Sequence, residues 1–284
     1  MLHPTRMKSN SMTNGNTSDK QYIFIGGLHR SGTSLLHRIL ASHPDITGFH
    51  NTGVPEDEGQ HLQSVFPAAN KFGGPGKFCF DSGSVMNEDS QLIKQKEETK
   101  HLLLEQWEKW WDISKPIRIE KSPPNLIRSR FFQSLFGKEN TKFIFITRHP
   151  ITVSLATQKW SKTSLNELID HWCTGYRLML SDLKHIHNWH LVRYEDLILT
   201  PDIVLQKLYD FLSLANNTTT TEDIWIDGNK NYFEQWQTQL SDTPDIVKDI
   251  SCFSEDMIPF GYQVTPPFVT TALSTNTLLA KHIK

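Results

Sequence analysis

The sequence predicts an α/β fold in which a parallel β-sheet is flanked by helices, with a P-loop-like segment after its first strand. Residues 21–40 read QYIFIGGLHRSGTSLLHRIL, which is an apolar run, a glycine loop and then a helical pattern of apolar residues. Three further short apolar runs, at 117–119, 142–146 and 189–192, are separated by helical stretches. Strands that alternate with helices form parallel sheets covered by helices on both faces.

The glycine loop at residues 26–34 has the composition of an anion-binding site. Glycines let backbone N–H groups approach a phosphate closely, and a helix start adds partial positive charge. Arg30 adds a planar cation, and Ser31, Thr33 and Ser34 add hydroxyl groups. The spacing matches the P-loop pattern GxxxxGKS/T, except that Thr33 stands where the lysine should be. The loop therefore indicates a phosphate ester other than a transferred γ-phosphate; the alternative is a glycine turn without a ligand.

The rest of the chain is expected to hold helices and one long irregular segment. The first helix should end near residues 42–44. Further helices are predicted at 89–111, 125–136, directly after 150, 165–187 and 201–212, with a helix pair within 225–263. Residues 50–76 mix acids, histidines and aromatic residues, and long loops inside compact domains are usually functional or disordered. We predict that this segment is a substrate loop.

The chain of 284 residues is long enough for one domain with a large core. We expect a polar, disordered leader at 1–20, one domain at 21–265 and a C-terminal tail at 266–284. A net charge of −2 gives no basic excess for nucleic acid, and no apolar run approaches the roughly 20 residues of a membrane span. Three cysteines, Cys79, Cys173 and Cys252, form neither a zinc pattern nor a disulfide framework, so we expect a cytoplasmic protein without a metal.

Polar residues follow each of the four predicted strands where the strand ends. These residues are Arg30, Lys121, Arg148 and Tyr194. In doubly wound sheets, ligands bind outside the carboxyl ends of the strands. The four side chains are therefore expected to converge on one crevice.

Four segments in this order resemble the sulfotransferase family that uses 3′-phosphoadenosine 5′-phosphosulfate (PAPS). They read GLHRSGTSLLHRIL, EKSPPN, FIFITRHPITVSLA and LVRYEDL. The similarity is of the bacterial type and extends to tyrosyl-protein and heparan-modifying members. It covers roughly residues 21–265 and implies the P-loop-like sulfotransferase fold, PAPS as donor and PAP as product.

The resemblance also implies roles for individual residues. The loop around Arg30 matches the family's 5′-phosphosulfate loop, Arg148 matches the arginine that binds the 3′-phosphate, and Tyr194 matches a tyrosine near the nucleotide. The family usually has a serine where Ala156 stands, and Ser154 is a nearby substitute. The residues expected to bind the cofactor are His29, Arg30, Ser31, Gly32, Thr33, Ser34, Arg148, Ser154 and Tyr194.

The catalytic residues are expected to be Lys121, Arg30 and a base. Lys121 matches a lysine that contacts the sulfuryl group in related enzymes, and cations stabilise the charge that grows on the leaving phosphate. The family's base, a glutamate, would fall at Asn51 by an ungapped count. We favour Glu58 instead, with His61 and Glu56 behind it, because charge repulsion within the acids at 56–58 would raise a pKa. The alternative is a solvated loop without a catalytic role.

The favoured function is transfer of a sulfuryl group from PAPS to a hydroxyl or amine of a small-molecule acceptor. The acidic loop suits a cationic natural product, such as a saxitoxin-type alkaloid. No nucleic acid or membrane partner is expected, and a homo-oligomer is compatible with the composition. The alternatives are a nucleotide kinase with an altered P-loop, which would require Mg²⁺, and a nucleotide-binding regulator, which would bind PAP without turnover.

Overall fold

The computed structural model describes residues 20–215, 226–243, 245 and 250–270, and its centre is a parallel sheet of five strands. The strand order is β2-β3-β1-β4-β5, and every neighbouring pair is parallel. The strands are β1 Gln21–Gly26, β2 Ile46–Gly48, β3 Ile117–Lys121, β4 Thr141–Thr147 and β5 Trp189–Arg193. The predicted α/β fold with a parallel sheet flanked by helices is thereby confirmed.

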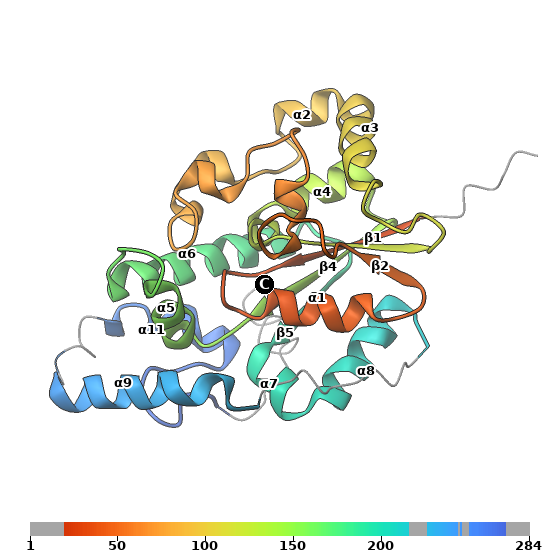
Figure 1. Ribbon diagram of the computed structural model, residues 1–284. Coiled ribbons are helices and arrows are strands. Elements are labelled where there is room, and N and C mark those ends of the chain that lie inside the picture. The colour runs from red at the N-terminus through yellow and green to blue at the C-terminus, as the bar shows by residue number, and fades with distance from the viewer. Residues whose placement is uncertain (1–19, 216–225, 244, 246–249, 271–284) are drawn as a thin grey trace, which may run out of the picture.

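Helices cover both faces of this sheet (Figure 1). One face packs against α1 Thr33–Ala41, α7 Tyr194–Leu199 and α8 Pro201–Leu212. The other packs against α3 Lys96–Trp107, α4 Ser129–Phe136 and α6 Leu165–Leu183. The remaining described helices are α2 Gln91–Lys94, α5 Pro150–Gln158, α9 Lys230–Asp242 and α11 Ser254–Met257.

Alternation along the strands assigns each side chain to one of these two layers. In β1, Ile23 and Ile25 lie in the core with α1, α7 and α8, whereas Tyr22 and Phe24 lie in the core with α4 and α6. The ring of Phe24 stacks on Phe132 of α4, with 4.2 Å between ring centroids. Because successive strand residues point to opposite faces, burial on both sides produces the continuous apolar runs that identified these strands.

Several boundaries differ from those predicted. The stretch predicted as one helix at 89–111 is two helices, α2 and α3, which are separated at Gln95 and end at Trp107. The helix predicted at 125–136 begins as a 3₁₀ turn, Pro123–Ile127, followed by α4. The helix predicted to reach residue 187 ends at Leu183. The strand β2 was not predicted, because three residues are too few to show a period.

The predicted substrate loop is folded rather than structureless. Between β2 and α2 the chain makes a series of short 3₁₀ turns, at Pro55–Asp57, Gly59–His61, Ala69–Phe72, Phe78–Phe80 and Ser82–Ser84. Phe66 and Phe78 anchor this segment in the core. The indole N–H of Trp107 donates to the carbonyl of Gly59 at 2.9 Å. These contacts hold the acidic part of the segment at the carboxyl edge of the sheet.

Residues 1–19 of the expected leader at 1–20 and residues 271–284 of the expected tail at 266–284 lie outside the described residues. Within the tail, Val269 forms an antiparallel bridge with Tyr262. The domain limits therefore stay predictions. Among the described helices, none has the length and apolar character needed to cross a bilayer.

Burial lowers the pKa of six histidines, His61 among them, because removing an imidazolium from water is unfavourable. The pKa falls to about 3 for His29, His37 and His171, and to about 4 for His149 and His190. The unfolded chain, with ordinary histidine pKa values near 6.5, takes up protons first as the pH falls. Burial raises the pKa of Glu120 to about 7 and also raises the pKa of Glu58 and Asp182, and these three carboxyl groups act in the opposite direction.

We therefore predict that stability is retained above about pH 6.5 and declines below it. Each unit of pKa difference is worth about 1.4 kcal/mol, so the thermal midpoint should fall by roughly 10 °C between pH 7.5 and pH 5.5. The substitution His190→Gln should reduce this pH dependence, whereas His101→Gln, at an exposed position on α3, should not. Calorimetric scans at both pH values test this, and equal slopes for the two variants would contradict it.

Candidate functional site

The glycine loop between β1 and α1 is compact and leaves the start of the helix open. Arg30 and Gly32 adopt left-handed backbone conformations, with φ of 69° and 99°. The Ser31 hydroxyl donates to the carbonyl of Leu28 at 2.6 Å, inside the loop. No side chain caps the start of α1 at Gly32. The first N–H groups of α1 are therefore available to an anion.

Gly32 is required by the close approach of Tyr194. A Cβ atom at Gly32 would lie 2.6 Å from the Tyr194 ring, and the positive φ adds strain for any other residue. Tyr194 is the first residue of α7, directly after β5. The glycine thus lets the loop after β1 pack against Tyr194, which follows β5.

Arg148 follows β4 and contacts both the glycine loop and Tyr194. Its guanidinium donates to the carbonyl of Arg30 at 2.9 Å, to the carbonyl of Gly228 at 2.6 Å and to Oδ1 of Asn229 at 2.7 Å. It also lies over the Tyr194 ring, 4.3 Å from the centroid. Three of its five N–H groups are thus engaged by the described residues, which holds the guanidinium in one orientation.

Asn229 is itself held by a buried carboxylate. Glu195 accepts hydrogen bonds from the Asn229 side chain, from the backbone N–H of His149 and from the Tyr262 hydroxyl. The orientation of Arg148 therefore depends on Asn229, which lies 81 positions away in sequence. No sequence motif points to Asn229.

A cavity of about 340 Å³ opens beside the glycine loop. Its walls include seven of the residues predicted to bind the cofactor: His29, Arg30, Gly32, Thr33, Ser34, Arg148 and Tyr194. Ser31 is fully buried with its hydroxyl turned into the loop. Ser154 lines a separate, much smaller cavity beside His29 and His171. The structure therefore does not bring Ser31 or Ser154 to the wall of the cavity of about 340 Å³ that Arg148 lines.

Lys121, at the end of β3, is buried and links three elements. Its Nζ donates to the Ser34 hydroxyl at 3.1 Å and to the carbonyl of Glu56 at 2.6 Å. It also forms an ion pair with Glu58, with 3.6 Å between Nζ and Oε1. Burial lowers the pKa of Lys121, and the nearby carboxylates of Glu58 and Glu56 oppose that shift. This one ammonium group connects the sheet, α1 and the segment at residues 50–76.

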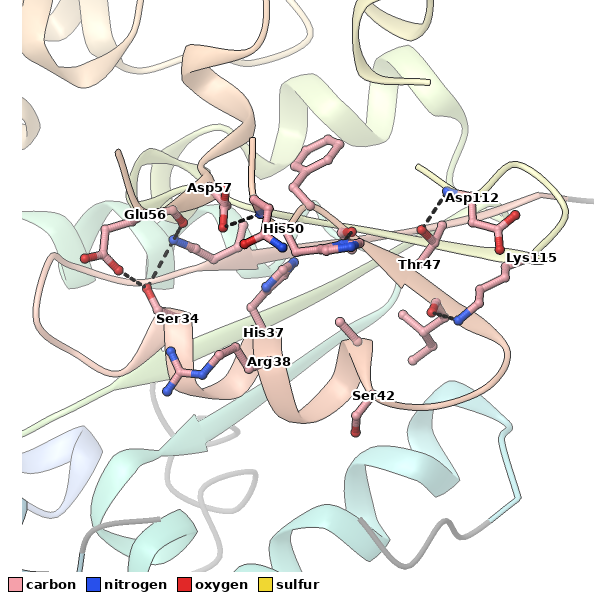
Figure 2. A pocket seen from close by; sticks show the side chains of 16 residues that line it. Ser34, His37, Arg38, Ser42, Thr47, His50, Glu56, Asp57, Asp112 and Lys115 are labelled. Carbon is pink, nitrogen blue, oxygen red and sulfur yellow. Dashed lines mark hydrogen bonds between the residues drawn. The ribbon is translucent and has the colours of Figure 1, made fainter. Parts of the chain in front are cut away.

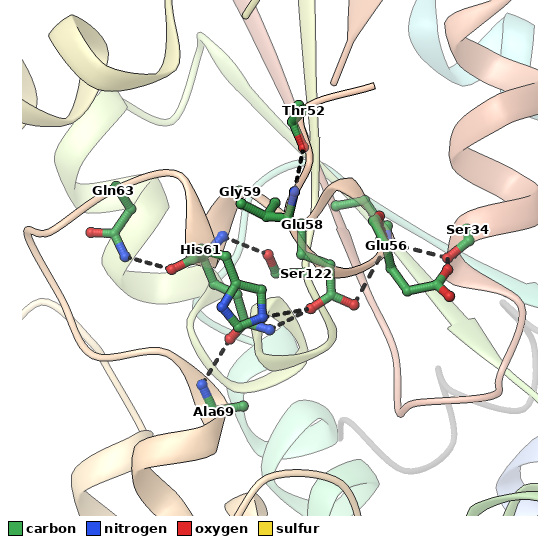
Figure 3. A network of polar contacts seen from close by, with 12 residues as sticks. Ser34, Thr52, Glu56, Glu58, Gly59, His61, Gln63, Ala69 and Ser122 are labelled. Atoms are coloured by element: carbon green, nitrogen blue, oxygen red, sulfur yellow. Dashed lines mark hydrogen bonds and ion pairs between the residues drawn. The ribbon is translucent and has the colours of Figure 1, made fainter. Parts of the chain in front are cut away.

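Glu58 lies between Lys121 and two further polar side chains (Figure 3). Its Oε2 accepts a hydrogen bond of 2.5 Å from Gln60 and lies 3.7 Å from Nε2 of His61. Burial raises the pKa of Glu58, while Lys121 and Gln60 lower it. We expected charge repulsion to raise this pKa; the charge of Glu56 does contribute, but burial is the main cause.

Glu56 occupies a different position from Glu58. Its Oε2 accepts a hydrogen bond of 2.9 Å from the Ser34 hydroxyl, and its backbone is left-handed, with φ of 54°. Asp57 is left-handed too, and its carboxylate accepts hydrogen bonds from Thr52 and from the N–H of Asn51. Asp57 therefore shapes the loop, while Glu56 faces the glycine loop.

A second cavity of about 610 Å³ adjoins the first, and Ser34, Arg38 and Glu56 line both. Figure 2 shows α1 on one side and residues 46–51 on the other, with Asp112 and Lys115 at the far end. Lys121 also lines this cavity. Its acids, Glu56, Asp57 and Asp112, are matched by the bases Arg38, Lys115 and Lys121.

Trp160, just beyond α5, is a site residue that the sequence analysis did not identify. The Arg30 guanidinium lies over its ring at 4.4 Å, and the side chain is exposed at the edge of the smaller cavity. A single tryptophan after a helix carries no pattern, so only the fold reveals its position. Among the described residues, no group of three or more histidine, cysteine, aspartate or glutamate side chains is placed to hold a metal ion.

Comparison with known proteins gives a family. The model of the sulfotransferase family matches residues 22–218, which include the glycine loop, Lys121, Arg148 and Tyr194.

Solved structures with similarity to the chain include three sulfotransferases. The sulfotransferase domain from the curacin biosynthetic pathway is 15% identical, with 93% of this chain and 97% of that chain covered and a TM-score of 0.48. The sulfotransferase domain of the Synechococcus PCC 7002 olefin synthase is 16% identical, with 93% and 94% covered and a TM-score of 0.44. Mouse sulfotransferase SULT7A1 complexed with PAP is 13% identical, with 76% and 64% covered and a TM-score of 0.39.

The match over residues 22–218 spans most of the described sheet and the segments that line both cavities. The chain belongs to the sulfotransferase family.

Proposed function

We propose that this chain transfers a sulfuryl group from PAPS to a hydroxyl or amine of a small-molecule acceptor. The proposal rests on one observation: polar residues that follow four strands of the sheet line two adjoining cavities. Arg30, Arg148 and Tyr194 line the smaller cavity, and Lys121 lines the larger. Family membership supplies the reaction class, and these side chains supply the groups that the reaction needs.

The smaller cavity fits a nucleotide with anionic groups at two places. The open start of α1, Arg30 and the Ser34 hydroxyl lie at one place, and Arg148 with Tyr194 lies at the other. Neither arginine has a carboxylate ion pair among the described residues, so both can bind phosphate. In the proposed role, His29, Gly32 and Thr33 complete the walls. Ser31 shapes the loop, and the contact of Ser154 with the nucleotide stays a sequence prediction.

When bound, PAPS supplies the sulfuryl group, whose bond to a phosphate oxygen breaks as the bond to the acceptor forms. Lys121 and Arg30 stabilise the negative charge that develops on the leaving phosphate. Glu58 takes the proton of the acceptor hydroxyl or amine. The raised pKa of Glu58 makes it a better base than an exposed carboxylate, and Nε2 of His61 lies 3.7 Å from its Oε2.

The acceptor would approach from the larger cavity. The volume of this cavity, about 610 Å³, lies within the range of about 300–1,000 Å³ for small-molecule sites. A cationic natural product, such as a saxitoxin-type alkaloid, stays a proposal from the acidic loop alone. The balanced acids and bases of the lining do not by themselves select a charge.

Titration with PAP, and with ATP plus Mg²⁺ in parallel, tests the donor site. We predict tight PAP binding and much weaker ATP binding, because no lysine follows the glycine loop to hold a γ-phosphate. The substitution Arg148→Ala should weaken PAP binding at least tenfold, since a charge-assisted phosphate contact is lost. Arg177→Ala, on the outer face of α6, is the control. Tight ATP binding with weak PAP binding would refute the proposed donor.

A second prediction concerns Lys121. The substitution Lys121→Ala should lower turnover with PAPS by at least 100-fold while leaving most of the PAP affinity, because the ammonium faces the cavity boundary rather than Arg148. Rapid-quench measurement of PAP formation, combined with titration, separates the two effects. Turnover near that of the wild type would show that this role of Lys121 is wrong.

A third prediction distinguishes the candidate bases. Glu58→Gln should lower kcat at least 100-fold, whereas Glu56→Gln should lower it far less. In the wild type, kcat should rise with pH through a value above the ordinary glutamate pKa of 4.5, because burial raises the pKa of Glu58. This acid limb should vanish in Glu58→Gln. The opposite order of the two variants would assign the base to Glu56.

A further inference from the structure

Glu120 is a buried carboxylate directly behind the proposed catalytic groups. It precedes Lys121 on β3 and is 1% exposed. Its Oε1 accepts a hydrogen bond of 2.5 Å from the Ser122 hydroxyl, and its Oε2 accepts one of 2.5 Å from the Asn125 amide. Burying a carboxylate without partners is costly. Both oxygens of Glu120 accept a hydrogen bond, so Glu120, Ser122 and Asn125 form a polar junction in which the carboxylate is satisfied.

One branch of this junction reaches the proposed base. The Ser122 hydroxyl donates to Glu120 and in turn accepts a hydrogen bond of 3.0 Å from the backbone N–H of Gln60. The side chain of Gln60 then donates to Oε2 of Glu58 at 2.5 Å. Figure 3 shows Ser122 beside the side chains of Glu58 and His61. Gln60 thus links Ser122 with Glu58, since its backbone N–H bonds the Ser122 hydroxyl and its side-chain amide bonds the Glu58 carboxylate.

The other branch reaches the strand that leads into the glycine loop. The amide of Asn125 donates both to Glu120 and to the carbonyl of Ile25 at 3.0 Å.

At Gly59, a Cβ atom would lie 2.5 Å from Oε1 of Glu120. The substrate loop therefore passes directly over the carboxylate, and only glycine permits this approach.

We infer that Ser122, held by Glu120, is a positioning residue that keeps Glu58 against Lys121. The inference rests on the proposed role of Glu58 as base. The segment around Glu58 consists of short 3₁₀ turns with left-handed residues at 56 and 57, so regular secondary structure does not hold it in place. The hydrogen bond to the N–H of Gln60 supplies that restraint two residues from Glu58.

The substitution Ser122→Ala tests this role. The prediction is a loss of kcat of about tenfold, with PAP affinity and the KM for the acceptor within twofold of the wild type, because misplacement of a base affects the chemical step. Ser129→Ala is the matched control: Ser129 is also fully buried, and its hydroxyl has no hydrogen-bond partner among the described residues. Equal kcat values for the wild type and Ser122→Ala would overturn the inference.

A double-mutant cycle shows whether Ser122 acts through Glu58. In a Glu58→Gln background, Ser122→Ala should lower the residual kcat less than twofold, since the base is already absent. The same tenfold loss in both backgrounds would overturn the positioning role while leaving the proposed function intact. Wild-type turnover in Glu58→Gln would instead refute the base itself.

Glu120→Gln is the second variant, for the case that Ser122→Ala does not fold. It keeps the size of the side chain and one carbonyl oxygen but loses an acceptor for the junction. It should lower kcat in the wild-type background and have little effect in Glu58→Gln, with PAP binding retained in both. Additive losses in Glu120→Gln and Glu58→Gln would overturn the inference.

Discussion

The buried ammonium group of Lys121 is the interaction on which the candidate site depends. A buried cation is costly unless it is paired and hydrogen-bonded, and Lys121 is compensated by Glu58, by the carbonyl of Glu56 and by the Ser34 hydroxyl. These partners belong to the segment at residues 50–76 and to α1, so satisfying one charge brings both elements to the end of β3. Without these partners the buried charge would be uncompensated, and this requirement favours a defined path for an irregular loop.

Much of the fold could be predicted because its strands are buried on both faces. Continuous apolar runs such as 142–146 are typical of parallel strands, and Figure 1 shows the two helical layers that bury them. β2 escaped prediction because three residues carry no period. The break at Gln95 escaped it because the Lys/Glu-rich stretch around it reads as a continuous helix on propensity alone.

The candidate site could be predicted where chemistry follows directly from a strand end. Arg30, Lys121, Arg148 and Tyr194 were placed together by that rule, and the structure brings them to adjoining cavities. Contacts between distant segments could not be predicted in the same way. The hydrogen bond from Arg148 to Asn229 depends on how the chain returns after α8, and the cation–π contact of Arg30 with Trp160 depends on the end of α5.

The distribution of ion pairs explains how a chain with a net charge of −2 can present an anion site. Lys121 is paired with Glu58, so its charge is largely compensated before any ligand binds. Arg148 donates to neutral oxygens, and Arg30 lies over Trp160. In the part of the chain that the structure describes, no carboxylate forms an ion pair with either arginine. Positive charge is therefore concentrated at the glycine loop and Arg148, the proposed phosphate-binding groups, and it is balanced at Lys121, beside the proposed base Glu58.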